Sequence, residues 1–156
     1  MASELVVELK QTRPFATLEE EAGVSIQRTA AVLGHAFSEA LKAYGITPTQ
    51  YNVLRILRGA GKEGLCRNEV RDRLVAQVPD ATRLLDRMVE MGLVSRDRDT
   101  PDRRYVTARI TAKGTKLVTD LDDPVTRLHR SRLGHLGRSK LRQLIDLLAE
   151  ARRDSA

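Results

Sequence analysis

The chain of 156 residues contains one cysteine, no tryptophan and only 3% aromatic residues. The single cysteine, Cys66, cannot form an intramolecular disulfide or a cysteine-based zinc site, so the sequence predicts a reduced, cytoplasmic protein. No apolar run approaches the roughly 18 residues of a membrane-spanning helix. The first residues include Glu4 and Glu8 and no long apolar stretch, which argues against a secretory signal.

Motifs for catalysis and metal binding are also missing from the sequence. It contains no recognisable glycine-rich phosphate-binding loop, no Gly-x-Ser-x-Gly and no His-Glu-x-x-His motif. His35, His129 and His135 are far apart, and none is paired at a spacing of four with another histidine or with the cysteine. A zinc site would therefore need several carboxylates to complete it. The sequence predicts a protein that is not an enzyme and that carries no metal and no cofactor.

The charge of the chain points to a class of partner. The chain has 27 basic and 21 acidic residues, a net charge of +6 and a pI near 9.9. The excess lies in residues 65–113 and in residues 124–156. A positive surface favours a polyanionic partner such as nucleic acid. The basic side chains of the C-terminal part also fit an ordinary solvated helix face.

Helix signals begin after an N-terminal segment without clear periodicity. We interpret residues 1–16, which contain Pro14, as a loose or extended arm. Residues 17–20 fit a Thr-x-x-Glu capping box that opens a long helix with apolar residues at alternating steps of four and three. The positions of this stripe are Ile26, Ala30, Leu33, Phe37, Ala40 and Tyr44.

The centre of the chain has the pattern of a helix, two shorter helices and a hairpin. A capping box at residues 47–50, with Pro48 at the first helical position, opens the first helix. Three of its residues should be buried: Tyr51, Leu54 and Leu57. The segments that follow are a short helix at 68–74, a tight connection at 75–78, a second helix at 79–91, a strand at 93–97, a polar hairpin tip at 98–104 and a strand at 105–110.

Two more helical segments complete the chain. Thr111 should cap the first, and Pro124 predicts a kink or a local break within it. The last helix starts near Ser139 and should bury four residues: Leu141, Leu144, Ile145 and Leu148. These residues and the N-terminal stripe need more apolar partner surface than a small lobe offers, so we expect an obligate dimer.

Two short helices with a tight turn and a basic hairpin are typical of a winged helix-turn-helix. We therefore predict a mostly α fold with a small β-hairpin wing. The second helix fits the major groove of DNA, where an arginine such as Arg83 can donate two hydrogen bonds to guanine, and tip arginines can enter the minor groove. The candidate DNA-binding residues are Pro79, Asp80, Thr82, Arg83, Asp86, Arg87, Arg103 and Arg104. The spacing of Asp102 and Arg104 also predicts an ion pair at the wing tip.

From residue 45 to about residue 117 the chain resembles the MarR family of bacterial transcription regulators. The matching stretches are residues 45–51, 82–96, 102–104 and 110–114. The resemblance implies a homodimeric repressor on a palindromic double-stranded DNA operator, which a small, often phenolic ligand releases. It also implies three parts: an N-terminal arm and dimerisation helix in residues 1–45, a DNA-binding lobe in residues 46–113 and C-terminal dimerisation helices in residues 114–156.

The resemblance also implies where a ligand would bind, between the dimer layer and the DNA-binding lobe. The candidate pocket residues are His35, Phe37, Tyr51, Arg55 and Leu121. One departure from the family is that residues 76–81 lack the usual Ser/Thr-rich helix start, and Asp80 adds a negative charge there.

Three alternatives stay open from the sequence. Cys66 stands where many relatives carry a capping Ser or Thr, so it is either a structural cysteine or, at a helix N-terminus, a redox switch. The winged helix could bind protein instead of DNA, which a shallow salt dependence of binding to duplex DNA would reveal. It could also be a DNA-binding repressor without ligand control.

Overall fold

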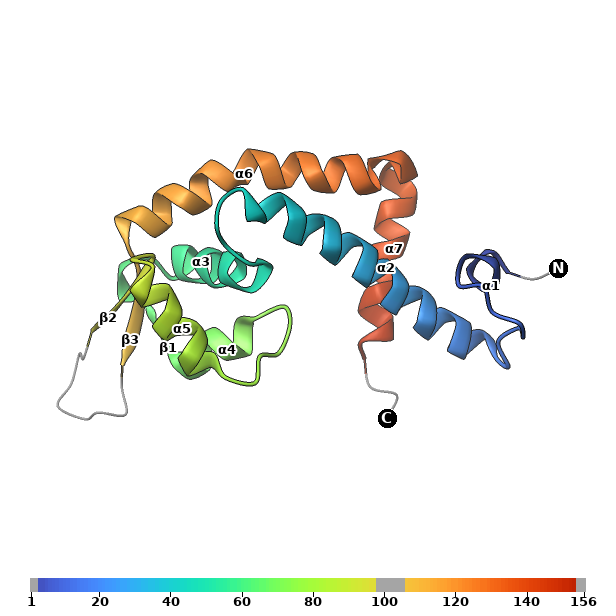
Figure 1. Ribbon diagram of the computed structural model, residues 1–156, viewed down its shortest axis with the longest axis horizontal. Helices are drawn as coiled ribbons and strands as arrows, with labels where there is room; N and C mark the ends of the chain where they lie inside the picture. The colour runs from blue at the N-terminus through green and yellow to red at the C-terminus, as the bar shows by residue number, and fades with distance from the viewer. Residues whose placement is uncertain (1–2, 98–105, 154–156) are drawn as a thin grey trace. The chain divides into compact units, whose positions relative to one another are not determined.

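The computed structural model describes residues 3–97 and 106–153. The chain divides into two compact units, residues 1–39 and residues 40–156, and one long helix begins in the first and ends in the second (Figure 1). The predicted wing-tip residues, Asp102, Arg103 and Arg104, lie outside the described residues, so their ion pair and DNA contacts stay predictions.

The first unit contains α1 (Glu4–Glu8) and most of α2 (Leu18–Lys42). In α1 the Ser3 hydroxyl accepts a hydrogen bond from the Val6 N–H at 3.4 Å, and Leu5 and Val6 are buried. The prediction of a loose arm over residues 1–16 is therefore wrong for α1. A serine N-cap followed by adjacent apolar side chains is a helix signal that periodicity over so few residues does not reveal.

The start of α2 follows its predicted cap with one difference. The Thr17 hydroxyl accepts from the Glu20 N–H at 3.1 Å, as expected for a capping box. The Glu20 carboxylate accepts from the Ala16 N–H at 2.8 Å, one residue before the cap. Farther along, the Arg28 guanidinium donates to Glu8 at 2.7 Å and joins α2 to the end of α1.

The second unit holds the winged-helix elements and the C-terminal helices. In chain order after α2 they are α3 (Pro48–Ala60), the 3-10 turn η1 (Gly61–Glu63), β1 (Leu65–Cys66), α4 (Arg67–Arg73), α5 (Ala81–Glu90), β2 (Val94–Asp97), β3 (Thr107–Ile110), α6 (Ala112–Leu133), the 3-10 turn η2 (Gly134–Leu136) and α7 (Gly137–Ala151). The predicted capping box of α3 is confirmed, since Thr47 and Gln50 each accept the other's backbone N–H.

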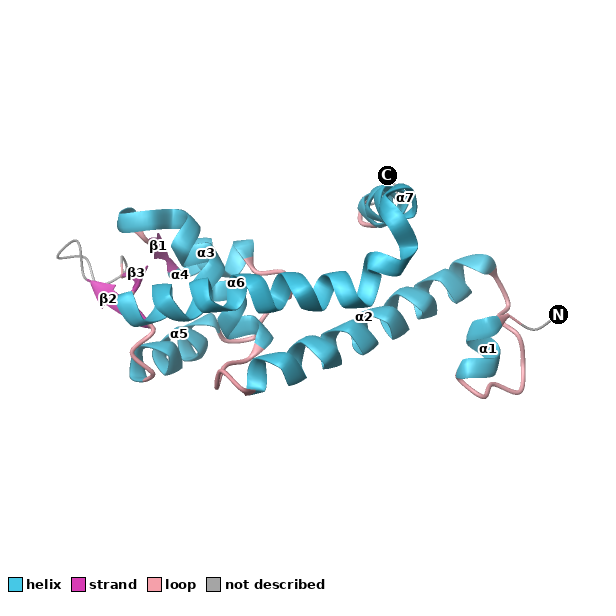
Figure 2. Cartoon of the chain, turned by 90° about the horizontal axis from the view of Figure 1, so that it is seen from above, coloured by secondary structure: helices cyan, strands magenta, loops and turns pink. Residues whose placement is uncertain are grey.

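The strands form one antiparallel sheet in the order β1-β3-β2. The β2–β3 hairpin was predicted, whereas β1 was not, because two residues are too few to show an alternating pattern. Leu65 of β1 pairs with Ala108 of β3, and Arg96 of β2 pairs with the same alanine from the other side. Both views place the strands at the end of the unit where α6 begins (Figures 1 and 2).

The lobe core is formed by side chains from α3, α4, α5, the strands and α6. Its fully buried members include Val53, Leu54, Leu57, Val70, Leu85, Met88, Leu93, Val94, Val118 and Leu121. The start of α6 packs so closely on this core that a Cβ on Gly114 would lie 2.3 Å from the Leu93 carbonyl oxygen. Thr111 caps α6 as predicted, with its hydroxyl accepting from the Gly114 N–H at 3.0 Å.

A glycine cluster before the sheet matches the spacing of a nucleotide-binding loop but not its context. Gly59, Gly61 and Gly64 have Gly-x-Gly-x-x-Gly spacing, so the expectation that no glycine-rich motif occurs is wrong for the spacing itself. They follow a helix and precede a strand, the reverse of the strand-to-helix order that such a loop needs. Gly64, with φ +69, instead allows β3 to approach: a Cβ there would lie 2.4 Å from the Ala108 carbonyl oxygen.

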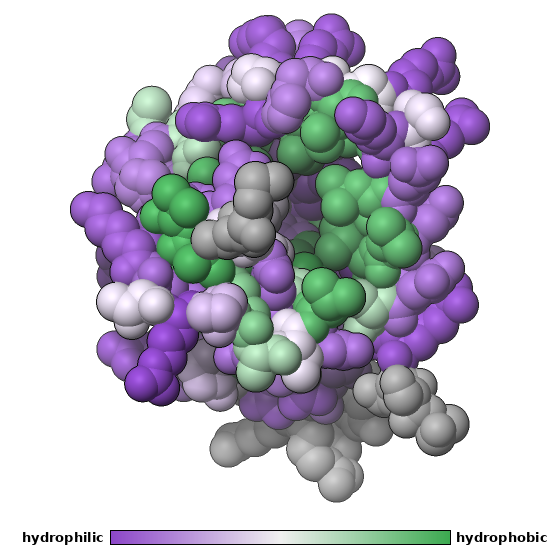
Figure 3. Space-filling view, turned by 90° about the vertical axis from the view of Figure 1, so that its right-hand side faces the viewer, coloured by the Kyte–Doolittle hydropathy of each residue, from purple (hydrophilic) through white to green (hydrophobic). Residues whose placement is uncertain are grey.

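Two expectations for the C-terminal part differ from the structure of the single chain. Of the kink or local break predicted at Pro124, the break does not occur, because α6 runs continuously from Ala112 to Leu133, and the kink stays a prediction. The last helix, α7, is described in full and buries none of its side chains, including those of Leu141, Leu144, Ile145 and Leu148. Ile145 is 63% exposed. Figure 3 shows apolar residues (green) exposed among hydrophilic ones (purple) on one face of the molecule.

Candidate nucleic-acid interface

The interface is centred on α5, which begins two residues later than the sequence indicated. Its N-cap is Asp80, whose carboxylate accepts from the Arg83 N–H at 2.9 Å, and its first helical residue is Ala81. Pro79 therefore precedes the helix instead of opening it. The Asp80 carboxylate is already engaged by a backbone donor, which is the usual task of an aspartate at this position.

Helix α5 separates an apolar face from a polar face, as its periodicity predicted. Ala81, Leu85 and Met88 are buried in the lobe core. The opposite face exposes four charged residues, Arg83, Asp86, Arg87 and Glu90, with Thr82 half-buried at its edge. The guanidinium groups of Arg83 and Arg87 form no ion pair with any residue in the described part of the chain. They are therefore available to an external anion.

Arg96 of β2 links the sheet to α5 through its guanidinium. Its guanidinium donates to the Thr82 carbonyl oxygen at 3.1 Å and forms an ion pair with Asp86. The Asp86 carboxylate is thus neutralised by a neighbour, which reduces its repulsion toward DNA. The sequence interpretation missed this role of Arg96. Its place in a short strand directly after the helix was the available signal, since alternation directs such a side chain to one face of the sheet.

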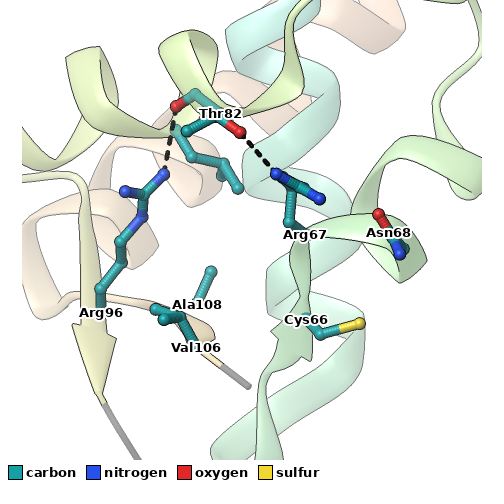
Figure 4. Close-up of a pocket in the computed structure, with 8 residues that line it drawn as sticks. Cys66, Arg67, Asn68, Thr82, Arg96, Val106 and Ala108 are labelled. Atoms are coloured by element: carbon teal, nitrogen blue, oxygen red, sulfur yellow. Dashed lines mark hydrogen bonds between the residues drawn. The ribbon is translucent and has the colours of Figure 1, made fainter. Parts of the chain in front are cut away.

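Arg67 holds the same threonine from the opposite side. It is the first residue of α4, and its guanidinium donates to the Thr82 hydroxyl at 3.0 Å. Figure 4 shows Arg67 and Arg96 approaching Thr82 from α4 and from β2. A cavity of about 520 Å³ lies beside them and is lined by Cys66, Arg67, Asn68, Thr82, Leu85, Arg96, Val106 and Ala108. Arg67 was not among the predicted site residues.

A hydrogen bond from α3 fixes the connection between α4 and α5. The Asn52 side-chain oxygen accepts from the Val75 N–H at 2.8 Å. This bond fixes the backbone just after α4, so the two helices of the motif keep a defined relation. The Val75 side chain itself is 92% exposed.

The base of the wing is ordered by Arg109 of β3. Its guanidinium donates to the Asp97 carboxylate at 2.9 Å and to the Lys62 carbonyl oxygen at 2.8 Å. One side chain thereby joins β3 to the end of β2 and to η1. The hairpin strands leave the lobe from a fixed position, although the tip that they carry lies outside the described residues.

Cys66 occupies the cap position of α4 that the sequence suggested. The Glu69 carboxylate accepts from the Cys66 N–H at 2.8 Å. This hydrogen bond lowers the pKa of Glu69, with smaller contributions from the Cys66 side chain and from the charge of Arg73. Cys66 is half-buried and forms no disulfide, which fits a structural cap.

The candidate pocket residues lie in both units. His35 and Phe37 are on α2 within the first unit, whereas Tyr51, Arg55 and Leu121 belong to the second. In the second unit, burial raises the pKa of Tyr51 above its ordinary value of 10.0, and the Asp122 charge acts in the same direction. The charges of Arg55 and Arg58 act against this shift.

A bidentate ion pair lies next to this tyrosine and joins α3 to α6. Both nitrogens at the end of Arg58 donate to the Asp122 carboxylate, at 2.8 and 2.9 Å. This pairing lowers the pKa of Asp122 and raises that of Arg58. Arg55 remains exposed one helical turn after Tyr51, so the structure brings an aromatic hydroxyl and a cation together on α3.

Two other kinds of site are absent from the described residues, a metal centre and a membrane span. No group of three or more His, Cys, Asp or Glu side chains there could hold a metal ion. Among the same residues, every helix is too short or too polar to cross a membrane.

Comparison with known proteins agrees with this geometry. Residues 35–121, more than half of the chain, match the family described as transcriptional regulator SarA/Rot. The HTH-type transcriptional regulator FarR of Neisseria gonorrhoeae is 31% identical over 114 residues, which cover 73% of this chain and 77% of FarR.

Two solved structures are similar over nearly the whole chain. A MarR transcription factor from Planctomyces limnophilus has a TM-score of 0.68 and 38% identity, covering 86% of this chain and 98% of its own. The structure of NadR in complex with 4-hydroxyphenylacetate has a TM-score of 0.68 and 27% identity, covering 89% of this chain and 97% of its own.

Proposed function

The chain belongs to the MarR family of winged-helix, DNA-binding transcription regulators, and we propose that it acts as a homodimer on a palindromic operator, as a repressor that a small ligand releases. The observation that carries this proposal is the exposed polar face of α5, where the guanidinium groups of Arg83 and Arg87 form no ion pair with residues 3–97 or 106–153, on a helix that Arg96 and Asp80 hold in place. Arg83 then reads a base edge in the major groove, and Arg87 supports it. Arg103 and Arg104 enter the adjacent minor groove from the wing tip.

The exposed apolar side chains of the terminal helices support the homodimer. Ile26 and Val32 of α2 are 44% and 43% exposed, and Ile145 and Leu147 of α7 are each 63% exposed. Apolar surface of this kind is stabilised by burial against another chain. A two-fold dimer presents two copies of α5, which match half-sites about 10 base pairs apart, so the operator is an inverted repeat.

Selection of duplexes from a random pool tests sequence-specific binding directly. The wild-type protein should enrich an inverted repeat, and its binding to random duplex should weaken steeply with salt. Arg83→Ala should weaken binding to the enriched duplex by roughly 1–3 kcal/mol and leave binding to random duplex nearly unchanged. Arg142→Ala, which removes the same charge from the exposed surface of α7, is the matched control.

Two outcomes of this selection would contradict the proposal. An enriched duplex without internal symmetry would remove the two-fold operator. Failure to enrich any duplex, together with a shallow salt dependence, would favour a winged-helix module that binds protein.

Ligand control is supported by the pairing of Tyr51 with Arg55 on α3. A buried tyrosine beside an exposed guanidinium suits an aromatic ring that carries a carboxylate or phenolate. The similar protein NadR was crystallised with 4-hydroxyphenylacetate. This compound is the first probe: it should raise the melting temperature and release the selected duplex, and Arg55→Ala should remove both effects while Lys116→Ala keeps them. Duplex binding that no aromatic acid changes would indicate a ligand-independent repressor.

A further inference from the structure

We propose that Arg67 is a specificity-determining residue that acts through Thr82, by directing the threonine hydroxyl so that its hydrogen is donated to DNA. This inference rests on the proposed role of α5 as the recognition helix. It adds a residue of α4 to base reading, although α4 would otherwise serve only as support.

The geometry isolates Thr82 as the point where three elements meet. Its hydroxyl accepts from Arg67 of α4 at 3.0 Å, and its carbonyl accepts from Arg96 of β2 at 3.1 Å (Figure 4). Both the side chain and the backbone of this one residue are therefore fixed by guanidinium groups. Thr82 is the second residue of α5, at the end of the helix that carries Arg83.

The donors and acceptors of Arg67 and Thr82 bias the direction in which the Thr82 hydroxyl hydrogen points. A guanidinium is only a donor, so the Thr82 oxygen must accept from it. The hydroxyl still has one hydrogen to donate, and no acceptor for it occurs among the described residues. On a helix at a groove, that hydrogen meets a base acceptor such as guanine O6 or N7, adenine N7 or thymine O4. Arg67 occupies one of the two lone pairs of the hydroxyl oxygen and so biases the hydroxyl toward donation, whereas a threonine without Arg67 rotates freely between donating and accepting, and its preference weakens.

A simpler role for Arg67 is a direct contact to a DNA phosphate, since its side chain is exposed. A phosphate contact and an oriented threonine hydroxyl differ in how they affect DNA affinity. A phosphate contact affects all sequences alike and adds to the salt dependence, whereas a hydroxyl held in one orientation affects only the sequence that it reads. The hydrogen bond to Thr82 favours the second role, because a guanidinium committed to α5 has less freedom to follow the DNA backbone.

The test compares the affinities of Arg67→Ala, Thr82→Val and the double variant for two fluorescent duplexes. One duplex is selected from a random pool by the wild-type protein, and the other is a scrambled duplex of the same composition. Each single variant should weaken binding to the selected duplex by roughly two- to tenfold, the range of one hydrogen bond. The double variant should be no weaker than Thr82→Val alone. Binding to the scrambled duplex and the salt slope should stay unchanged. Melting curves confirm that each variant is folded, and Arg73→Ala is the control for loss of one charge from exposed α4.

Repeating the selection with the variants gives an independent readout. Arg67→Ala and Thr82→Val should relax the preference at the same base position of each half-site. The inference is overturned if Arg67→Ala weakens binding to both duplexes equally and lowers the salt slope by about 0.9, because these results define a phosphate contact.

The proposed function has its own point of failure. If Arg83→Ala loses discrimination while Arg67→Ala and Thr82→Val retain it, α5 reads DNA without help from Arg67 and only the inference fails. If Arg83→Ala also retains full discrimination, α5 is not the recognition helix and both proposals fail.

Discussion

The winged-helix lobe and the terminal helices differ in how completely one chain buries their apolar side chains. In the lobe, Leu54 and Leu57 of α3 are fully buried, as is Met88 of α5. On α7, Leu144 is 36% exposed and Ile145 is 63% exposed. Both regions show the same helical spacing of apolar residues in the sequence. The difference teaches that periodicity identifies an apolar face but does not reveal whether its partner lies in the same chain or in another.

The largest expected effect tests the claim that the lobe completes its own core. Leu57→Ala removes a fully buried side chain and should lower the free energy of unfolding by about 2–5 kcal/mol, since it leaves a cavity that the surrounding helices fill only in part. Denaturant unfolding at two protein concentrations is the measurement. The loss should be the same at both, and a loss seen only in dilute solution would show that the lobe core depends on a second chain.

The next effect tests the opposite claim, that α7 depends on a second chain. Ile145→Glu places a carboxylate on its apolar face, and burying an unpaired charge costs about 3 kcal/mol or more, so dimer dissociation should become roughly a hundredfold easier. Sedimentation across a concentration series measures this. Gln143→Glu adds the same charge to an exposed position on another side of α7 and should leave the dimer intact. A wild-type chain that is already a folded monomer at micromolar concentration would contradict the comparison.

The features that could be predicted from the sequence are those with strong local signals. The caps at Thr47 and Thr111, the two faces of α5 and the β2–β3 hairpin follow from residue type and spacing alone, and all are confirmed. Elements that depend on few residues were missed, namely α1 and β1. Pro124 predicts a kink or a local break in α6; the break is absent, because one lost backbone hydrogen bond is tolerated in a helix whose Val118, Leu121 and Val125 are buried.

The candidate site was predictable in its exposed part and not in its supports. Arg83 and Arg87 follow from the amphipathic pattern of α5. Arg96 and Arg67 contact α5 from elements that come after and before it, and no sequence spacing indicates that both reach Thr82. Asp80, a candidate for DNA contact, also caps α5 through its carboxylate. The cap follows from the backbone geometry, and the DNA contact stays a prediction.

A smaller effect sharpens the comparison inside the lobe, at the cap of α5. Asp80→Ala should lower the free energy of unfolding by about 1 kcal/mol, the usual value of an N-cap, whereas Asp80→Asn, which keeps the cap and removes the charge, should be nearly neutral. Binding to random duplex should tighten for Asp80→Asn because a negative charge near DNA is lost. Thermal melting and a duplex titration measure the two effects separately. Equal destabilisation by both substitutions would mean that the charge, not the hydrogen bond, stabilises α5.

The smallest effect concerns the ion pair between Arg58 and Asp122, which joins the lobe to the helix that continues toward α7. The two side chains are 32% and 48% exposed, so the pair should contribute less than about 1 kcal/mol. Its pH dependence has a definite sign. Because Arg58 lowers the pKa of Asp122, the contribution is fully present above the ordinary value of 3.8 and is lost as the pH falls through the lower pKa of the folded state.

Asp122→Asn removes this contribution and gives the last test of how firmly the two regions are joined. The variant should be slightly less stable than the wild type at neutral pH, and the difference should shrink as the pH falls below 3.8. Denaturant unfolding over a pH series measures it. Asp120→Asn is the matched control, because Asp120 pairs with Lys116 at 2.6 Å within α6 and connects no second element. An exposed pair within one helix contributes about 0.3–0.5 kcal/mol. If both substitutions cost the same, the bidentate pair between α3 and α6 adds nothing beyond an ordinary helix pair, and the lobe and the C-terminal helices are joined by apolar packing alone.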